Sequence, residues 1–292
     1  MGRIIKNIYK YVISCIYYFF FVKRHAYHIL TPDETSQLIH DKGKSVSRFG
    51  DGEFRVILGS GNGFQRPNER LGKRLEEVLN SDNEKLLVSI PYALKSTSLL
   101  VFKARFFWKT FLFDYGSLIS KYLSPTRIYG DTNFTRFYLD HKNKKNRQKS
   151  FDLIKALWEN RNVLLVEGKY TRMGVGNDIF DNVKSLRRII CPSKNAFDKY
   201  DEILESTLSH VHPGDLVLCA LGMTATVLAY DLSSHGIQVL DIGHLDIEYE
   251  WMTMGAVNKV AIPNKAVNET GYTPEGELDE SEYNGVIIDK IL

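Results

Sequence analysis

The sequence has few cysteines and almost no excess charge. These two features exclude some kinds of metal site and give no sign of a polyanion partner. Its three cysteines (Cys15, Cys191 and Cys219) lie far apart in 292 residues, without a CxxC pair or a Cys/His zinc spacing. This usage excludes a cysteine-based zinc site and is typical of a reducing, cytoplasmic protein with buried thiols. The net charge is only +3, so the total gives no bias toward nucleic acid or another polyanion.

The apolar run near the N-terminus, Tyr11 to Val22, is too short to cross a bilayer comfortably. A helix of this length spans roughly 18 Å, against a hydrocarbon core of about 30 Å. A signal peptide would need a small-residue cleavage site, and Val22-Lys23-Arg24-His25 is not one. Because lysine and arginine flank the run on both sides, residues 1–24 are predicted to lie in the plane of an anionic membrane surface, on the inner face of the cell membrane. The alternative is a helix packed on the protein's own core or on a second subunit.

The sequence does contain a regular alternation of helices and strands. With 43% hydrophobic residues the chain can bury a large core, and its length fits one large or two modest domains. Helical patterns in the second half, one of them carrying Ile179, Phe180, Val183 and Leu186, alternate with short β-branched strands. These strands are predicted at 163–166, 188–191, 216–221 and 238–242. The pattern predicts an α/β fold with a Rossmann-like, mainly parallel sheet in the C-terminal half.

The predicted organisation has four parts. Residues 1–28 form the membrane-surface or oligomerisation helix, and residues 29–150 form an α/β part. Residues 151–267 form the Rossmann-like, nucleotide-binding part. Residues 268–292 form an acidic tail, in which Asn268 to Gly285 is expected to be a surface loop.

The 29–150 part holds a clear helix start and an aromatic, basic stretch. Thr31 and Glu34 predict a capping box around Pro32, and Gly43 ends that helix. The stretch from Phe102 to Tyr122 is rich in aromatic residues and cations. We interpret it as a core helix and its cover, and the alternative is an acceptor-facing or lipid-facing surface.

The stretch from Val239 to Trp251 is predicted to be the centre of the functional site, because polar side chains directly follow an apolar run that reads as a buried strand. After Gly243 come His244, Asp246 and Glu248 at alternate positions. In extended chain, alternate side chains share one face, and ligands of open α/β sheets bind beyond the carboxyl ends of the strands. The pattern predicts a functional face at this sheet edge, and the alternative is a solvated edge strand.

Two carboxylates two residues apart follow the predicted strand at Ser45 to Phe49. Asp51 and Glu53 lie in the turn Gly50-Asp51-Gly52-Glu53. Such a pair suits a hard divalent cation, Mn²⁺ or Mg²⁺, that also takes phosphate oxygens. The alternative is an ordinary surface turn.

Two glycine-containing turns follow strands of the second half. Gly174-Val175-Gly176 is predicted to open a helix, and Leu221 to Thr226 forms a second strand-to-helix turn. Backbone N–H groups at such turns can meet a phosphate, so the two together predict a nucleotide diphosphate site. Ile179 occupies the third glycine position of a dinucleotide fingerprint and no acidic residue closes the next strand, which argues against NAD. Each turn alone is also compatible with an ordinary strand-to-helix connection.

Six motifs in order resemble the bacterial GT-D-fold glycosyltransferases, a family long carried as a domain of unknown function. They are Phe49-Gly50-Asp51-Gly52-Glu53, Val166-Glu167-Gly168, Gly174-Val175-Gly176-Asn177-Asp178, the stretch 191–197, the stretch 220–232 and the stretch 241–251. The resemblance covers roughly residues 30 to 268. Met223 stands where many relatives have proline, and the first 24 residues inherit nothing from the resemblance.

The resemblance implies a metal-dependent transfer of a hexose, typically glucose, from a UDP-sugar to a cell-surface glycan, a lipid-linked oligosaccharide or a glycoprotein. Asp51 and Glu53 match its DxE metal motif. Asp246 or Glu248, with His244 beside them, would act as general base or complete the metal shell. The implied nucleotide-binding residues are Arg172, Gly174, Gly176, Asn177, Ser193, Lys194, Asn195, Gly222 and Thr224.

Two other classes stay open. One is a nucleotide-sugar hydrolase or another nucleotide-dependent enzyme, and the other is a non-catalytic membrane adaptor with a vestigial nucleotide site. The complete acidic set of Asp51, Glu53, Asp246 and Glu248 counts against the adaptor, because a dead site has no need of carboxylates.

Overall fold

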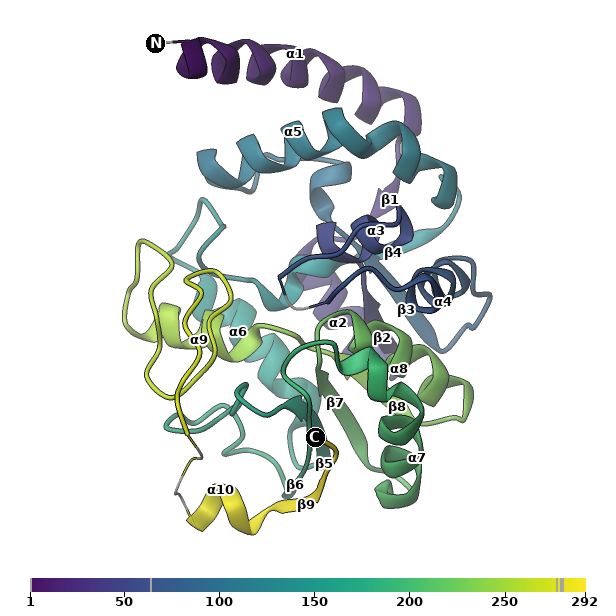
Figure 1. The fold of residues 1–292 in the computed structure, drawn as a ribbon, viewed down its shortest axis with the longest axis vertical. Helices are drawn as coiled ribbons and strands as arrows, with labels where there is room; N and C mark the ends of the chain where they lie inside the picture. Colours follow the sequence, from purple (N-terminus) through teal and green to yellow (C-terminus); the bar gives the residue numbers. More distant parts are fainter. Residues whose placement is uncertain (1, 64, 277, 279–280) are drawn as a thin grey trace.

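A computed structural model describes residues 2–63, 65–276, 278 and 281–292, and within them one parallel sheet organises the chain (Figure 1). Its nine strands run in the order β1-β4-β3-β2-β8-β7-β5-β6-β9, and every neighbouring pair is parallel. The strands are β1 (His28–Ile29), β2 (Ser45–Arg48), β3 (Leu86–Ile90), β4 (Ile128–Asp131), β5 (Asn162–Gly168), β6 (Ser185–Cys191), β7 (Leu216–Ala220), β8 (Gln238–Asp241) and β9 (Ile287–Lys290). The predicted parallel sheet is confirmed, and it extends through both halves of the chain.

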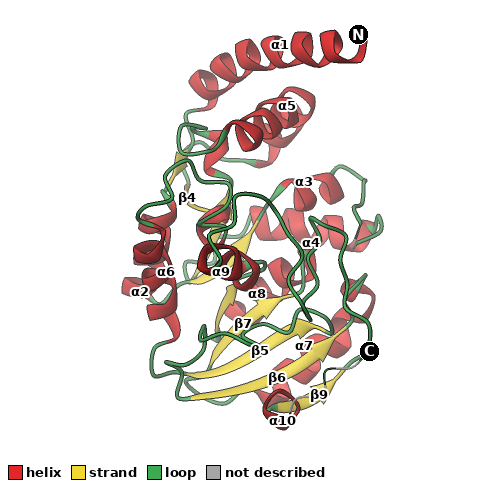
Figure 2. Ribbon diagram, turned by 90° about the vertical axis from the view of Figure 1, so that its left-hand side faces the viewer, coloured by secondary structure: helices red, strands yellow, loops and turns green. Residues whose placement is uncertain are grey.

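Helices cover both faces of this sheet (Figure 2). They are α1 (Gly2–His25), α2 (Pro32–Lys42), α3 (Asp51–Ile57), α4 (Glu69–Leu79), α5 (Phe102–Ile119), α6 (Arg147–Lys155), α7 (Tyr200–His210), α8 (Met223–Ser234), α9 (Leu245–Thr253) and α10 (Ser281–Gly285). Alternate residues of β5 pack into two separate hydrophobic cores, one on each face of the sheet, because successive side chains of a strand point to opposite faces. Leu164 and Val166 pack with α3, α4, α7 and α8, whereas Val163 and Leu165 pack with α2, α6 and α9.

Several local predictions are confirmed at residue level. Thr31 and Glu34 form the capping box of α2, and Gly43 ends that helix with φ +58°. Cys191 and Cys219 are fully buried, and Cys15 is half-buried. Burial raises the pKa of both buried thiols, which keeps them protonated and unreactive.

The helix predicted around Ile179 to Leu186 is wrong. Residues 169–184 form irregular turns, and Leu186 already belongs to β6. Ile179 and Phe180 are buried in the core beside Trp158, whose indole N–H donates to the Ile179 carbonyl at 3.0 Å. Apolar spacing that looked helical therefore marks two core contacts made from an irregular loop.

The tail is also more ordered than predicted. Residues 281–285 form α10, and the strand β9 that follows pairs with β6 at the edge of the sheet. Glu269, in the stretch predicted as a surface loop, is only 15% exposed in its side chain. This part of the chain completes the sheet and contributes to the cavity described below.

Helix α1 packs along α5 at one end of the molecule (Figure 1). Tyr11 stacks on Phe106 with ring centroids 5.1 Å apart, and Phe21 is buried. The alternative of packing on the protein's own core is therefore correct for one face of α1. In the part of the chain that is described, no helix is both long and apolar enough to cross a membrane.

A buried ion pair fixes the start of the loop after β5. Glu167 at the end of β5 and Arg188 in β6 lie at 0% and 5% side-chain exposure, and their charged groups are in contact. Glu167 also accepts the Met173 N–H at 2.9 Å, and Arg188 donates to the Met173 carbonyl at 2.8 Å. The pair therefore joins two strands and one loop residue in the buried interior.

Glu167→Gln is expected to destabilise the protein by about 3 kcal/mol, because it leaves a buried guanidinium without its counter-charge. The glutamine amide oxygen can still accept the Met173 N–H, so the lost free energy of unfolding measures the effect of the missing charge. The measurement is the free energy of unfolding from denaturant titration. As the matched control, Asp201→Asn removes the exposed Arg70–Asp201 pair and should cost no more than about 1 kcal/mol. Equal effects of the two changes would show that burial does not matter for these pairs.

Candidate active site

The carboxyl ends of the central strands border a cavity of about 600 Å³. Residues that follow β2, β5, β6, β7 and β8 form its floor, and α5 and α9 form part of its walls. Residues after β4, among them Arg136, add to the wall. Residues 254–276 after α9, here called the strap, contribute Lys259, Ala266, Asn268 and Glu269. Strands β2 and β8 are neighbours in the sheet, yet the chain leaves them toward opposite edges. Such a switch point is where open α/β sheets bind ligands.

An ion pair joins β2 to β8 at this point. The Arg48 guanidinium donates to Asp241 Oδ1 from Nε and Nη2, at 3.1 and 3.0 Å, and from Nη1 to Thr135 Oγ1 at 2.9 Å. The guanidinium lies against Gly243, where a Cβ would be 1.8 Å from Arg48 Nη2. Gly243 also has φ +46°, so only glycine fits both the backbone and the approach of Arg48.

The two predicted metal ligands face the cavity from the first turn of α3. Glu53 Oε2 accepts the Gly50 N–H at 2.7 Å, while the Asp51 carboxylate is 43% exposed and lies 3.5 Å from Arg55 Nε. Desolvation, with a smaller effect of the Asp241 charge, raises the pKa of Glu53 to about 7. Asp51 and Glu53 thus present two carboxyl groups to the cavity from one helical turn, which suits a cation.

The donor set fits a hard divalent cation that keeps other ligands. In the described residues no group of three or more His, Cys, Asp or Glu side chains is placed to hold a metal. Mg²⁺ commonly binds through one or two carboxylates, with water and substrate phosphates completing the shell. Asp51 and Glu53 could hold such an ion only together with a phosphate-bearing ligand.

The predicted extended arrangement of His244, Asp246 and Glu248 is wrong. Residues 245–253 form α9, so successive side chains turn by about 100° and the three do not share a face. His244 and Asp246 line the cavity. Glu248 is fully buried, and its Oε2 accepts the N–H groups of Tyr138 and Leu139 at 3.1 and 2.9 Å. Helix α9 therefore divides the predicted acidic set between the cavity and the core.

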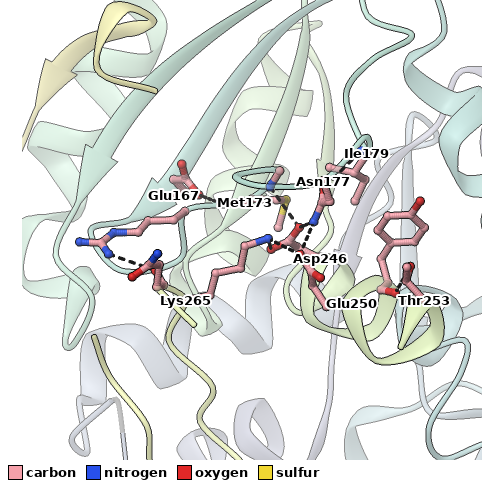
Figure 3. A network of polar contacts seen from close by, with 12 residues as sticks. Glu167, Met173, Asn177, Ile179, Asp246, Glu250, Thr253 and Lys265 are labelled. Atoms are coloured by element: carbon pink, nitrogen blue, oxygen red, sulfur yellow. Dashed lines mark hydrogen bonds and ion pairs between the residues drawn. The ribbon is translucent and has the colours of Figure 1, made fainter. Parts of the chain in front are cut away.

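Asp246 is the centre of a polar network at the cavity wall (Figure 3). Its Oδ1 accepts from the Gly174 N–H at 3.0 Å and from Asn177 Nδ2 at 2.8 Å. Its Oδ2 lies 2.8 Å from Lys265 Nζ, and that ammonium, only 2% exposed, also donates to Glu250 at 2.8 Å. Both carboxylate oxygens are therefore engaged in holding α9, the loop after β5 and the strap together.

His244 pairs with a residue that sequence reasoning placed elsewhere. Its Nε2 lies 2.8 Å from Glu269 Oε2, and Arg136 Nη1 donates to Glu269 Oε1 at 2.8 Å. Burial opposes ionisation of Glu269, but the hydrogen bond and charge of His244, with the charge of Arg136, hold its pKa well below the usual range. All three side chains line the cavity. Glu269 lies in the predicted surface loop and 133 residues from Arg136 in sequence, so no local pattern marks the pair.

The residues predicted to bind a nucleotide fall into two groups. Ser193, Asn195 and Gly222 line the cavity, and Gly222, with φ +55°, precedes the N-terminus of α8. The buried Thr224 hydroxyl in the first turn of α8 has no hydrogen-bond partner among the described residues. Arg172, Gly174, Gly176, Asn177 and Lys194 are not among the described residues that line the cavity.

The first glycine turn does not have the geometry that was predicted for it. No helix begins at Gly174, and its N–H is taken by Asp246. Arg172 is 3% exposed and donates to the carbonyl groups of Asn264 and Gly276 at 3.1 and 2.7 Å. In this structure Arg172 therefore tethers the strap, and the turn that offers a helix N-terminus to the cavity is the second one.

The fold is that of a known class of enzyme. Residues 46–270 match the family described as glycosyltransferase GT-D fold. Glycosyltransferase GlyD of Streptococcus pneumoniae serotype 4 is 39% identical over 262 residues, which are 89% of this chain and 32% of that protein. The probable glycosyl transferase Gly of Streptococcus gordonii is 37% identical over 264 residues, 89% of this chain and 38% of that protein. The chain thus spans about a third of the length of these relatives.

Solved structures agree with this match. One, reported as domain of unknown function 1792 with a distinct glycosyltransferase fold, superposes with a TM-score of 0.89 at 37% identity, over 94% of this chain and 99% of that chain. Another, described as a new glycosyltransferase of the same domain from Streptococcus sanguinis, gives a TM-score of 0.87 at 34% identity, over 91% and 100% of the two chains. The chain belongs to the GT-D-fold glycosyltransferase family.

A further buried carboxylate supports the cavity wall. Asp131, at the end of β4, is 2% exposed, and its Oδ1 accepts the N–H groups of Tyr92 and Asn133 at 3.0 and 2.9 Å. Burial raises its pKa from 3.8 to about 7. The folded protein therefore keeps a proton on Asp131 at pH values where the unfolded chain has lost it.

Asp131→Asn is expected to change how stability depends on pH. Asp131 contributes stability that is complete below about pH 4 and is lost as the pH rises to about 7, by at most about 1.4 kcal/mol per pH unit. The amide oxygen can accept the same two N–H groups but binds no proton. The free energy of unfolding of the parent minus that of the variant should fall between pH 4 and 7 and then level off. A constant difference across this range would contradict the raised pKa.

Proposed function

We propose that this chain transfers a hexose, glucose in the first instance, from a UDP-sugar to a cell-surface glycan, a lipid-linked oligosaccharide or a glycoprotein. The observation that carries the proposal is one cavity that brings the Asp51–Glu53 pair together with Gly222 at the N-terminus of α8. A helix N-terminus suits an anionic phosphate, and a carboxylate pair suits the cation that a diphosphate brings. Family membership supports glycosyl transfer as the reaction class. The cavity supports a donor with a diphosphate, and the choice of UDP-glucose is what the resemblance to the family implies.

The cavity has the size and side chains for such a donor. Its volume of about 600 Å³ is in the range of small-molecule sites. A divalent ion, when bound by Asp51 and Glu53, would offset negative charge on the leaving diphosphate. Ser193 and Asn195 would contact the nucleotide from the end of β6, and Gly222 would leave room for a phosphate at α8.

His244 is a better placed general base than Asp246 or Glu248. Both oxygens of Asp246 are engaged by Gly174, Asn177 and Lys265, and Glu248 lies in the core. His244 faces the cavity with one ring nitrogen held by Glu269. This arrangement orients the imidazole, and the charge of Glu269 stabilises the imidazolium that forms when a proton is taken from the acceptor hydroxyl.

The two rival functions predict different products. A nucleotide-sugar hydrolase would release free sugar equally fast with and without an acceptor, whereas a transferase needs the acceptor for fast turnover. A non-catalytic adaptor would bind the nucleotide and release nothing. Product analysis with UDP-glucose, with and without a glycan acceptor, separates all three. Turnover that is independent of the acceptor would replace the proposed transfer by hydrolysis.

Asp51→Asn and Glu53→Gln are each expected to lower UDP-sugar turnover by about two orders of magnitude or more, because the diphosphate charge loses its cation. EDTA should abolish turnover of the parent, and Mn²⁺ or Mg²⁺ should restore it. Glu202→Gln, which removes an exposed carboxylate on α7, is the control and should keep the parent rate. Full activity in the chelator would refute the metal assignment.

His244→Gln is expected to slow transfer by about 100-fold or more while leaving the affinities for UDP and Mn²⁺ unchanged, since the amide cannot take a proton and His244 is not one of the proposed ligands of either. Asp246→Asn should instead lower the melting temperature, because the buried Lys265 loses one of its two counter-charges. Single-turnover rates, titration calorimetry with UDP and Mn²⁺, and thermal melting distinguish the two roles. Transfer at the parent rate in His244→Gln would exclude it as the base.

A further inference from the structure

Helix α1 is apolar on the side that faces away from the protein as well as on the side that packs. Between Tyr11 and Val22 every side chain in the exposed class is apolar: Val12, Ile16, Phe19 and Phe20, at 51%, 56%, 52% and 63% exposure. These positions recur at helical spacing and form one continuous stripe. A helix that is apolar all round is normally covered on all sides. We therefore expect another surface to cover the outer stripe.

The packing of α1 fixes where this stripe points. Tyr17 meets Phe113 of α5 edge-on with ring centroids 5.7 Å apart, and Lys10 Nζ pairs with Asp114 at 2.7 Å. A Cβ on Gly116 of α5 would lie 3.0 Å from the Tyr17 hydroxyl oxygen, so a small residue lets the helices approach closely. Helix α5 lies between α1 and the rest of the fold (Figure 1), and the outer stripe therefore faces away from the molecule. The two helices are here called the α1–α5 layer.

The charge of this layer indicates which kind of surface can cover the stripe. The two helices carry eight lysines and arginines and one acidic residue, Asp114, while the whole chain has a net charge of only +3. At the edge of the stripe, Lys23 Nζ lies 4.2 Å from the centre of the Phe19 ring. A second copy of the chain on this face would bring two strongly positive layers together. An anionic surface would bring opposite charges together.

We propose that the α1–α5 layer docks in the plane of an anionic lipid bilayer. Val12, Ile16, Phe19 and Phe20 enter the boundary between headgroups and acyl chains, and the exposed Lys23 and Arg24 at the end of the stripe contact anionic headgroups. This inference rests on the two helices and not on the cavity, so it holds whatever the donor sugar is. It also places the cavity beside the membrane, because Lys103, Phe107 and Trp108 of α5 line the cavity wall.

The test is co-sedimentation of the full chain with vesicles of phosphatidylglycerol and phosphatidylcholine in equal parts, and with vesicles of phosphatidylcholine alone. Strong binding to the anionic vesicles and weak binding to the neutral ones is expected. Raising the salt from 0.05 to 0.5 M should release part of the bound protein, since salt screens the charges but not the apolar contact. Failure of the full chain to bind the anionic vesicles overturns the proposal.

Two variants separate the apolar and the charged contributions. Ile16→Ser with Phe20→Ser should reduce binding by tenfold or more, and Lys23→Gln with Arg24→Gln by about tenfold. The matched control, Ile128→Ser with Leu292→Ser, removes two apolar side chains of similar exposure elsewhere and should bind like the parent. A second pair, Val12→Ser with Phe19→Ser, tests the same stripe if the first pair unfolds. Parent-level binding by both folded stripe pairs overturns the proposal.

Sedimentation velocity without vesicles tests the competing occupant. A monomer is expected, and its stripe variants should remain monomeric. A dimer that the Ile16/Phe20 variant dissociates, in a chain that ignores the vesicles, would assign the stripe to a second copy and overturn the membrane assignment. None of these measurements uses turnover, so their failure is separate from failure of the proposed transferase activity.

Discussion

The ion pair between Arg48 and Asp241 is the interaction on which the rest of the site depends. Their strands, β2 and β8, are paired in register at Val46 and Leu240, and the ion pair extends this junction to the cavity floor. Thr226 of α8 reinforces it by donating to the Arg48 carbonyl at 2.9 Å. Directly after β2 come Asp51 and Glu53, and directly after β8 come His244 and Asp246. One buried contact thus sets the distance between two functional segments nearly 200 residues apart.

The same junction places buried carboxyl groups near one guanidinium. Arg48 pairs with Asp241, and its charge lowers the pKa of Glu53 and Asp131 less than burial raises it. The protons that these carboxyl groups retain near pH 7 act as local charge compensation. Burial therefore outweighs the nearby guanidinium charge in setting the protonation of these two groups.

The fold could be predicted from the sequence because local patterns of apolar and polar residues determine its strands and helices. Alternating apolar strands and amphipathic helices predicted the parallel sheet, and Thr31, Glu34 and Gly43 marked the ends of α2 correctly. The failures share one physical origin. A short polar run such as His244 to Glu248 fits either extended chain or a helix, and only the positive φ at Gly243 and the packing of α9 decide. Periodicity also could not separate core contacts of Ile179 and Phe180 from a helix face.

The candidate site was only partly predictable for a second reason. Some residues could be placed in the cavity because they directly follow strands whose carboxyl ends border it: Asp51, Glu53, Ser193, Asn195 and Gly222. Arg136, Lys259 and Glu269 reach it through contacts between distant segments, and the strap that carries two of them has no regular periodicity. Conversely, Arg172 and Asn177 were expected to bind the nucleotide because they belong to a motif. In the structure Arg172 donates to two carbonyl groups of the strap, and Asn177 donates to Asp246.

The strap is held to the loop after β5 and to α9 by a few contacts, so its own residues carry little of the fold. Arg172 donates to two of its carbonyl groups, its Lys265 pairs with Asp246 and Glu250 of α9, and a backbone bond from Ala266 to the Tyr170 carbonyl adds an anchor at 2.8 Å. Because no sheet strand runs through residues 254–276, changes between these anchors leave the strand order untouched. Substitutions of the strap side chains that line the cavity can therefore reshape its wall while the strands beneath keep their positions.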